Sequence, residues 1–396
     1  MNASFALLIA SSAAFAALLS GLLMLRLEQP GRAGIGPAGT LIALAAGIGL
    51  APGASPSWTP LVVGVVVAAL ARDGDELLHG ECALKLLWVM GSALALSWAG
   101  IELLSLATGT PYVREQWAVL SLGLEPTFLW STALPLSLLI GVVLLGGAPF
   151  HFWLADVFQG VRPWLAPLAA ATLQISGAVW LAARLDDVDQ FPPGARLAWG
   201  LLRIAAWVAF VAGAATLMAQ RRPERRVGTL ASLNGALVLA LIASGHGPDM
   251  RWLVHWASHL ALALTGASTL ARFLPVSTPA GLGSPILRRH PWITLAGLFS
   301  LFSLAGVPGT PGARVWLEVA RALGSTGRPD LLIPLGFAWL IGLWKSVEQL
   351  REAFGAPGPA RSTVRPVPAA ARGSIAIAGL GLLGLAGLGW ARLLPW

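Results

Sequence analysis

Charged residues are scarce in this sequence: they make up 11% of its 396 amino acids, whereas 56% are hydrophobic and the mean hydropathy is +0.74. A soluble domain carries about 25% charged residues, so this chain has too little charge to cover a water-facing surface. The deficit excludes a soluble enzyme, a coiled coil and a disordered chain. A helical protein that crosses a membrane many times is the class that remains.

Cysteine and lysine are almost absent as well. The single cysteine, Cys82, forbids an intrachain disulfide, and Lys85 and Lys345 are the two lysines. The sequence has no Walker loop, no cluster of metal-ligating residues and no nucleophile elbow. Gly379–Gly384 fits the dinucleotide pattern GxGxxG, but it lies in an apolar run without the preceding strand that the pattern requires. We therefore expect neither a cofactor nor a metal.

Apolar runs long enough to cross the hydrocarbon core recur along the whole chain. At roughly 30 residues for each helix and its connection, the length predicts an all-α bundle of about 11–13 membrane spans in a single integral membrane domain. The first run is expected to be a retained span, because it is too long for a signal peptide and no basic segment precedes it. The predicted spans lie near 3–25, 35–52, 58–71, 83–109, 127–147, 164–184, 197–219, 227–245, 252–273, 290–325, 331–350 and 373–395.

Arginines gather at the ends of the apolar runs, which is the pattern of cytoplasmic loops. We expect an integral protein of the lipid bilayer, in a bacterial inner membrane. Nucleic acid is not expected as a partner, because no long soluble segment is available to bind it. The clusters are Arg26 and Arg32; Arg221, Arg222, Arg225 and Arg226; Arg288 and Arg289; and Arg351, Arg361, Arg365 and Arg372.

Proline and glycine interrupt two of the apolar runs. The first interruption covers 147–160 and continues through Pro163 and Pro167, and the second covers Gly306–Gly312. A proline frees a backbone carbonyl, and lipid offers no donor to satisfy it. Such breaks are common along ion or substrate paths, although a simple kink or a loop between two spans also fits the sequence. Two broken helices are therefore part of the predicted bundle.

Ionisable residues inside apolar runs are candidate functional groups, because they are costly in a membrane. Glu102 is a carboxylate flanked by apolar residues, suited either to proton exchange or to a hydrogen bond near a helix end. His255 and His259 are four residues apart and share one helix face. The pair fits a proton relay, two structural histidines, or a metal site that lacks an evident third ligand.

Arg314 and Glu318 lie one helical turn apart, directly after the second interruption. They are predicted either to gate a path through the membrane or to form an ordinary pair near its surface. Lys345 lies towards the end of its apolar run and is predicted to extend to the membrane surface. Arg184 is predicted to mark the interfacial end of a helix.

Four segments resemble, in the same order, motifs of the antiporter-like subunits. These are the proton-translocating membrane subunits of respiratory complex I and of Mrp antiporters, with relatives in membrane-bound hydrogenases. Residues 147–160, GAPFHFWLADVFQG, resemble the family's APFHxWxPDVYxG stretch, and 304–312 resemble its SLAGIPPxxGF break. Residues 101–106 resemble its glutamate-bearing helix, and 220–226 the Q-x-[DN]-[IL]-K-R start of another helix. The motif sequences are most similar to those of the N-type subunit of complex I, whereas the histidine pair resembles that of the L-type subunit.

The resemblance implies a broken helix with a central lysine paired to the glutamate, and a hydrated chain of lysines, histidines and glutamates. This sequence departs from that pattern, and the chain is short for the family. Gln174, Ala263 and Trp316 stand near the positions where the family has lysines. A complete lysine-based pump of the family type is therefore not expected.

The resemblance implies an antiporter-like core over about 80–350, between N-terminal helices in 1–72 and a C-terminal helix at 373–395. It implies a subunit of a complex I-like NADH-quinone oxidoreductase that contributes to proton translocation, has no redox centre of its own, and contacts other membrane subunits and protons or Na⁺. Alternatives are a non-pumping structural subunit, an Mrp-type or hydrogenase subunit, or a stand-alone solute transporter. The expected path residues are Glu102 for charge coupling, His255 and His259 as relay, Arg314 and Glu318 as gate, and His151 and Asp156 at the first break.

Overall fold

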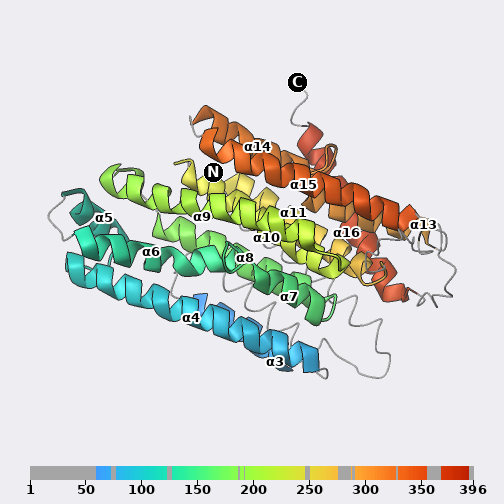
Figure 1. Cartoon of the computed structure of the whole chain (residues 1–396), viewed down its shortest axis with the longest axis horizontal. Helices are drawn as coiled ribbons and strands as arrows, with labels where there is room; N and C mark the ends of the chain where they lie inside the picture. Colours follow the sequence, from blue (N-terminus) through green and yellow to red (C-terminus); the bar gives the residue numbers. More distant parts are fainter. Residues whose placement is uncertain are drawn as a thin grey trace.

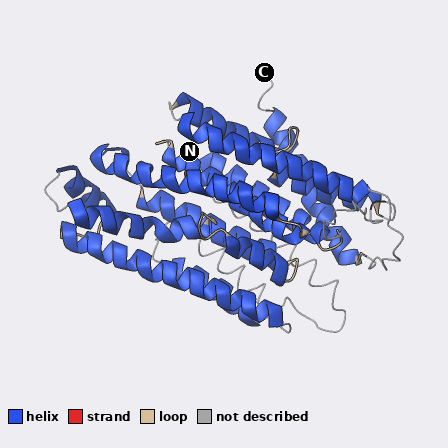
Figure 2. Cartoon of the chain, viewed as in Figure 1, coloured by secondary structure: helices blue, strands red, loops and turns tan. Residues whose placement is uncertain are grey.

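The computed structural model describes residues 59–72, 77–122, 127–185, 188–190, 192–245, 250–274, 287, 290–326, 329–354 and 367–391. The predicted spans at 3–25 and 35–52 lie outside the described residues. Within the described part the structure is helical and has no strand (Figure 2), which confirms the all-α prediction. Its α-helices are α3 (Thr59–Arg72), α4 (Leu77–Thr108), α5 (Val113–Leu122), α6 (Thr127–Leu144), α7 (Phe152–Gly160), α8 (Leu165–Arg184), α9 (Pro192–Ala219), α10 (Pro223–Ala243), α11 (Met250–Ala271), α13 (Pro291–Leu304), α14 (Pro311–Ser325), α15 (Pro329–Phe354) and α16 (Ala369–Ala391).

The long helices lie side by side as a bundle (Figure 1). Among the described residues, five helices are long and apolar enough to cross a membrane on their own: parts of α4, α8, α9, α10 and α15. Four shorter apolar helices accompany them. The long run at 83–109, which one tilted helix or two short ones would fit, is a single helix in the structure, α4.

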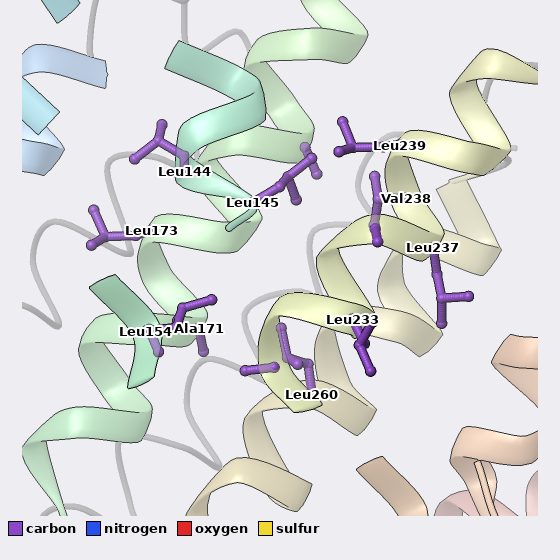
Figure 3. Close-up of a cluster of buried hydrophobic side chains, with 14 of the residues drawn as sticks. Leu144, Leu145, Leu154, Ala171, Leu173, Leu233, Leu237, Val238, Leu239 and Leu260 are labelled. Carbon is purple, nitrogen blue, oxygen red and sulfur yellow. The ribbon is translucent and has the colours of Figure 1, made fainter. Parts of the chain in front are cut away.

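Helix α10 forms the centre of the bundle. Its membrane-spanning window is buried throughout, and it contacts α7, α8, α9, α11, α13, α14 and α15. Figure 3 shows its leucines, among them Leu233 and Leu237, in a cluster with side chains of α6, α8 and α11. Gly235 is required for this packing, because a Cβ there would collide with the carbonyl oxygen of Leu145. Small residues at such contacts let membrane helices approach closely.

The first predicted interruption is a break between α6 and α7. The chain leaves α6 at Leu144, makes a tight turn and resumes a helix at Phe152. Two carbonyls that the turn frees are bonded by side chains: Gln174 Nε2 donates to Leu145 O (2.9 Å), and Ser232 Oγ donates to Gly146 O (2.6 Å). The same Gln174 nitrogen also donates to Ala231 O (2.8 Å), so this amide joins α8 to the break and to α10.

The second predicted interruption separates α13 from α14 and is built in a similar way. Asn234 Nδ2 donates to Leu304 O, the last carbonyl of α13 (2.9 Å), and Trp339 Nε1 donates to Gly306 O (2.9 Å). The side chain of Thr310 caps the start of α14 by accepting from the Ala313 nitrogen. Both interruptions are therefore breaks inside the bundle, and side chains from neighbouring helices supply donors to their free carbonyls.

We expect the amides of Gln174 and Asn234 to stabilise the fold. Gln174→Leu and Asn234→Leu keep similar volume but leave a buried carbonyl without its donor, which costs about 1–3 kcal/mol. Denaturant unfolding in detergent should show this loss in each variant. Gln190→Leu, at an exposed position, is the control and should match the wild type. Wild-type stability in both test variants would contradict the role given to the two amides.

Candidate functional site

A cavity of about 300 Å³ lies at the second break. The break and one face of α14 form most of its wall, and α11, α15 and α16 complete it. It brings together His255, Arg314 and Glu318, three of the predicted path residues, and adds Arg321. The remaining lining residues are Pro308, Gly309, Thr310, Pro311, Ala313, Leu317, Trp339, Leu385 and Ala386.

Helix α14 turns its polar face to this cavity because its polar and apolar residues follow the helical repeat. Arg314, Glu318 and Arg321 lie along one side, whereas Val315 and Trp316 are buried on the other. Arg314 Nε lies 2.7 Å from Glu318 Oε1, and the two side chains are 35% and 29% exposed. An ion pair with this exposure contributes at most about 1 kcal/mol to stability. Opening the ion pair would therefore cost the fold little stability.

The two histidines of α11 connect the cavity with the interior of the bundle. His255 lines the cavity, and His259 is fully buried one turn further along the helix. The His259 ring lies against the break itself: a Cβ at Gly312 would stand 2.9 Å from its Nε2. The described residues contain no group of three or more His, Cys, Asp or Glu side chains arranged to hold a metal ion.

At the three positions where the resemblance implies lysines, the side chains are buried and pack or form hydrogen bonds inside the bundle. Gln174 bonds two backbone carbonyls, as described above. Ala263 is buried in the core. Trp316 is buried and stacks on Trp339, with ring centroids 5.8 Å apart. None of the three places an ionisable group in the bundle.

Glu102 lies away from this cavity, on an exposed face of α4 with Trp98 and Leu106. Two residues along an α-helix correspond to a rotation of about 200°, so Glu102 points away from the side on which Gly100 contacts α6. Helix α4 packs mainly on α3, α5, α6 and α7, whereas both histidines belong to α11. The structure therefore does not bring Glu102 to the histidine pair, and its charge-coupling role stays a prediction.

The two candidates at the first break fasten α7 to its neighbours. His151 Nε2 is 2.9 Å from Thr216 Oγ1 of α9. Asp156 Oδ1 accepts from Arg225 Nη1 of α10 at 2.7 Å, and the same nitrogen is 2.7 Å from Gln159 Oε1. These contacts hold the second half of the broken helix in place.

A network of buried charges was not anticipated from the sequence. Arg226, at the start of α10, is fully buried and bonds Glu352 through Nη1 (3.2 Å) and Glu348 through Nη2 (3.1 Å). Lys345 Nζ lies 2.6 Å from Glu348 Oε2. The signal was the spacing of Lys345, Glu348 and Glu352, which puts all three on one side of a helix. The partner, Arg226, is more than a hundred residues away, in an arginine cluster whose pattern is typical of a cytoplasmic loop.

The structure shows what two basic residues near helix ends bind. The Lys345 side chain is only 11% exposed and pairs with Glu348, so it does not extend freely from the bundle as predicted. Arg184 is the last residue of α8, as predicted, but its side chain is buried and its Nη2 donates to Gln116 Oε1 at 3.3 Å. Gln116 belongs to α5, a short helix that the sequence did not predict and that covers this end of α8.

Comparison with known proteins adds partial sequence likeness, although no family model matches the chain. It is 28% identical over 172 residues to NADH-quinone oxidoreductase subunit N of Gemmatimonas aurantiaca, covering 42% of this chain and 32% of that protein. It is 25% identical over 213 residues to the subunit N of Heliobacterium modesticaldum, covering 52% of this chain and 42% of that protein. The chain thus aligns with less than half the length of either relative.

Solved structures share the fold over almost the whole chain. A chain of respiratory complex I from Thermus thermophilus matches with a TM-score of 0.74 at 20% identity, covering 96% of this chain and 84% of that one. A chain of the Mrp complex from Dietzia sp. gives 0.76 at 14% identity, covering 98% and 81%. A chain of the archaeal membrane-bound sulfane sulfur reductase gives 0.72 at 17% identity, covering 90% and 73%.

All three structural matches are to chains of multi-subunit membrane complexes. The apolar helices of this chain agree with an integral membrane protein. The four sequence motifs in family order, the relatives and the shared fold together support a likeness to the antiporter-like membrane subunits.

Proposed function

We propose that this chain is a membrane subunit of a complex I-like NADH-quinone oxidoreductase in a bacterial inner membrane and contributes to proton translocation through its second break. One observation carries the proposal: the cavity at a broken helix gathers His255, Arg314 and Glu318, and His259 continues from it into the core. The two relatives named subunit N support the choice of complex. In this proposal electron transfer belongs to partner subunits.

The proposed mechanism uses Arg314 as a fixed cation and three groups that exchange protons. Arginine keeps its charge in proteins, so Arg314 attracts the Glu318 carboxylate in the closed pair. A proton that reaches Glu318 neutralises it and opens the pair. His255, at the same cavity, then takes the proton and passes it to His259, because an imidazole has one ring nitrogen that accepts a proton and one that donates.

The first break takes no part in this proposed path. The carboxamide of Gln174 does not ionise, and its nitrogen is already bonded to two carbonyls. His151 and Asp156 hold α7 against α9 and α10, and in this proposal they act by shaping that break. Proton transfer is thus assigned to the second half of the chain alone, with Na⁺ as the alternative coupling ion.

A non-pumping structural subunit is the second candidate. It is favoured by Gln174, Ala263 and Trp316, which occupy the expected lysine positions with groups that do not ionise.

An Mrp-type or sulfane sulfur reductase-like assembly is distinguished by its partners. If the proposal is right, purification of the tagged chain should yield NADH-quinone oxidoreductase subunits. A chain that purifies alone and transports solute would contradict every one of these assemblies.

We expect Glu318→Gln to lower proton translocation by about tenfold or more, since loss of one positioned proton carrier has effects of this size or larger. The measurement is proton uptake into vesicles that contain the assembled complex. Glu81→Gln is the control, because Glu81 is an exposed carboxylate paired with Lys85 on α4. Full translocation by Glu318→Gln would favour the structural subunit.

Glu102→Gln in the same assay tests the charge-coupling role of Glu102, and unchanged pumping would remove that role.

We expect water to enter the cavity. Cysteine labelling can test this, because replacing the one native cysteine by Cys82→Ser leaves a background without thiols. Leu317→Cys lines the cavity, whereas Leu340→Cys is exposed on the outer face of α15. A membrane-impermeant maleimide should label the first variant and not the second, because lipid or a partner subunit covers Leu340. Equal protection of both positions would contradict a hydrated cavity.

A further inference from the structure

A buried polar stripe runs along α15 from the second break to the end of the helix that the basic loops adjoin. Lys345, Ser346, Gln349 and Glu352 are all buried. Their spacing puts them on one side of the helix, whereas the opposite side exposes large apolar residues such as Trp344. Ionisable residues inside membrane helices are costly and usually functional.

The stripe starts at the break itself. Trp339 donates a hydrogen bond to Gly306 O, and a Cβ at Gly342 would lie 3.4 Å from Ala305 O. Lys345 is three residues further along, which is about 4.5 Å of helix rise. His259 of α11 packs against the same break. Only a few backbone residues of the break therefore lie between the histidine pair and the polar stripe.

The charges of the stripe form a continuous chain. Lys345 Nζ is 2.6 Å from Glu348 Oε2, Glu348 Oε1 is 3.1 Å from Arg226 Nη2, and Arg226 Nη1 is 3.2 Å from Glu352 Oε1. Glu348 is 33% exposed, so the chain has one member that reaches the surface. A proton that moves from the ammonium of Lys345 to the carboxylate of Glu348 leaves a neutral amine and a neutral acid, and the step is balanced.

Gln349 supplies an independent observation beside this chain. It is 1% exposed, and neither its Nε2 nor its Oε1 has a hydrogen-bond partner among the residues that the structure describes. Buried polar groups of native proteins are almost always satisfied, by protein or by water. The amide lies one turn beyond Lys345 and next to Glu348 in sequence, so it points to a hydrated site beside the Lys345–Glu348 pair.

We propose that Lys345 and Glu348 are the proton-exchanging pair on the side of the basic loops, with Arg226 as the residue that positions Glu348 and Glu352 through its two ion pairs. The pair continues the path that starts in the cavity at the second break, and this inference rests on the proposed function. A clamp that only ties α10 to α15 needs no more than Arg226 and Glu352. Lys345 adds an amine that can release its proton, in a chain whose expected lysine positions hold Gln174, Ala263 and Trp316.

The test is Lys345→Arg in the assembled complex. Arginine keeps the positive charge and the ion pair but does not release its proton. Proton translocation should fall about tenfold or more, while the amount of assembled complex and its thermal unfolding midpoint stay at wild-type values. Lys85→Arg, in the exposed pair with Glu81, is the matched control and should translocate normally.

The outcomes separate this inference from the function on which it rests. Wild-type translocation by Lys345→Arg, together with a loss in Glu318→Gln, overturns the role of the pair and leaves the proposed path through the cavity. Wild-type translocation in both variants overturns the proposed function and this inference with it. If Lys345→Arg fails to assemble, Glu348→Gln replaces it, because the amide still accepts from Arg226 but cannot hold a proton; wild-type translocation there also overturns the proposal.

Discussion

Every backbone carbonyl that a broken helix frees inside a membrane needs a donor from the protein, because lipid supplies none. This requirement shapes the centre of the structure. Gln174 and Ser232 supply donors at the first break, and Asn234 and Trp339 supply them at the second. Two of these four residues belong to α10, so α10 has to lie between the breaks. Its small residues let both broken helices approach closely enough for the bonds to form.

The two breaks meet the same requirement with different consequences. At the first break, Gln174, where the resemblance implies a lysine, is itself the donor, so a bonded amide stands at that position. At the second break, Asn234 and Trp339 bond the carbonyls, and His255 of α11 lines the cavity beside it. The same architecture therefore holds one break bonded by an amide and one beside a cavity that His255, Arg314 and Glu318 line, which agrees with a path confined to the second half.

Charges in the bundle are few, and most are paired. A buried ion pair seldom adds stability, because the loss of hydration offsets the attraction between its members. The network around Arg226 is therefore difficult to explain as a stabilising device alone. The network lies at the end of α15 that adjoins the basic loops. From the second break, the cavity extends the opposite way, along α14. A path across the membrane requires groups in both directions.

The sequence by itself determined the membrane class, the helical fold, both breaks, and the local pairs Arg314–Glu318 and His255–His259. All of these follow from composition or from spacing within one helix, where a repeat of 3.6 residues fixes which side chains are neighbours. Only the tertiary structure decided the direction in which Glu102 points, the bonding of Gln174, and the burial of Lys345 and Arg184. These depend on which helices lie side by side, and Arg226 meets Glu352 across 126 residues of chain that local spacing does not constrain.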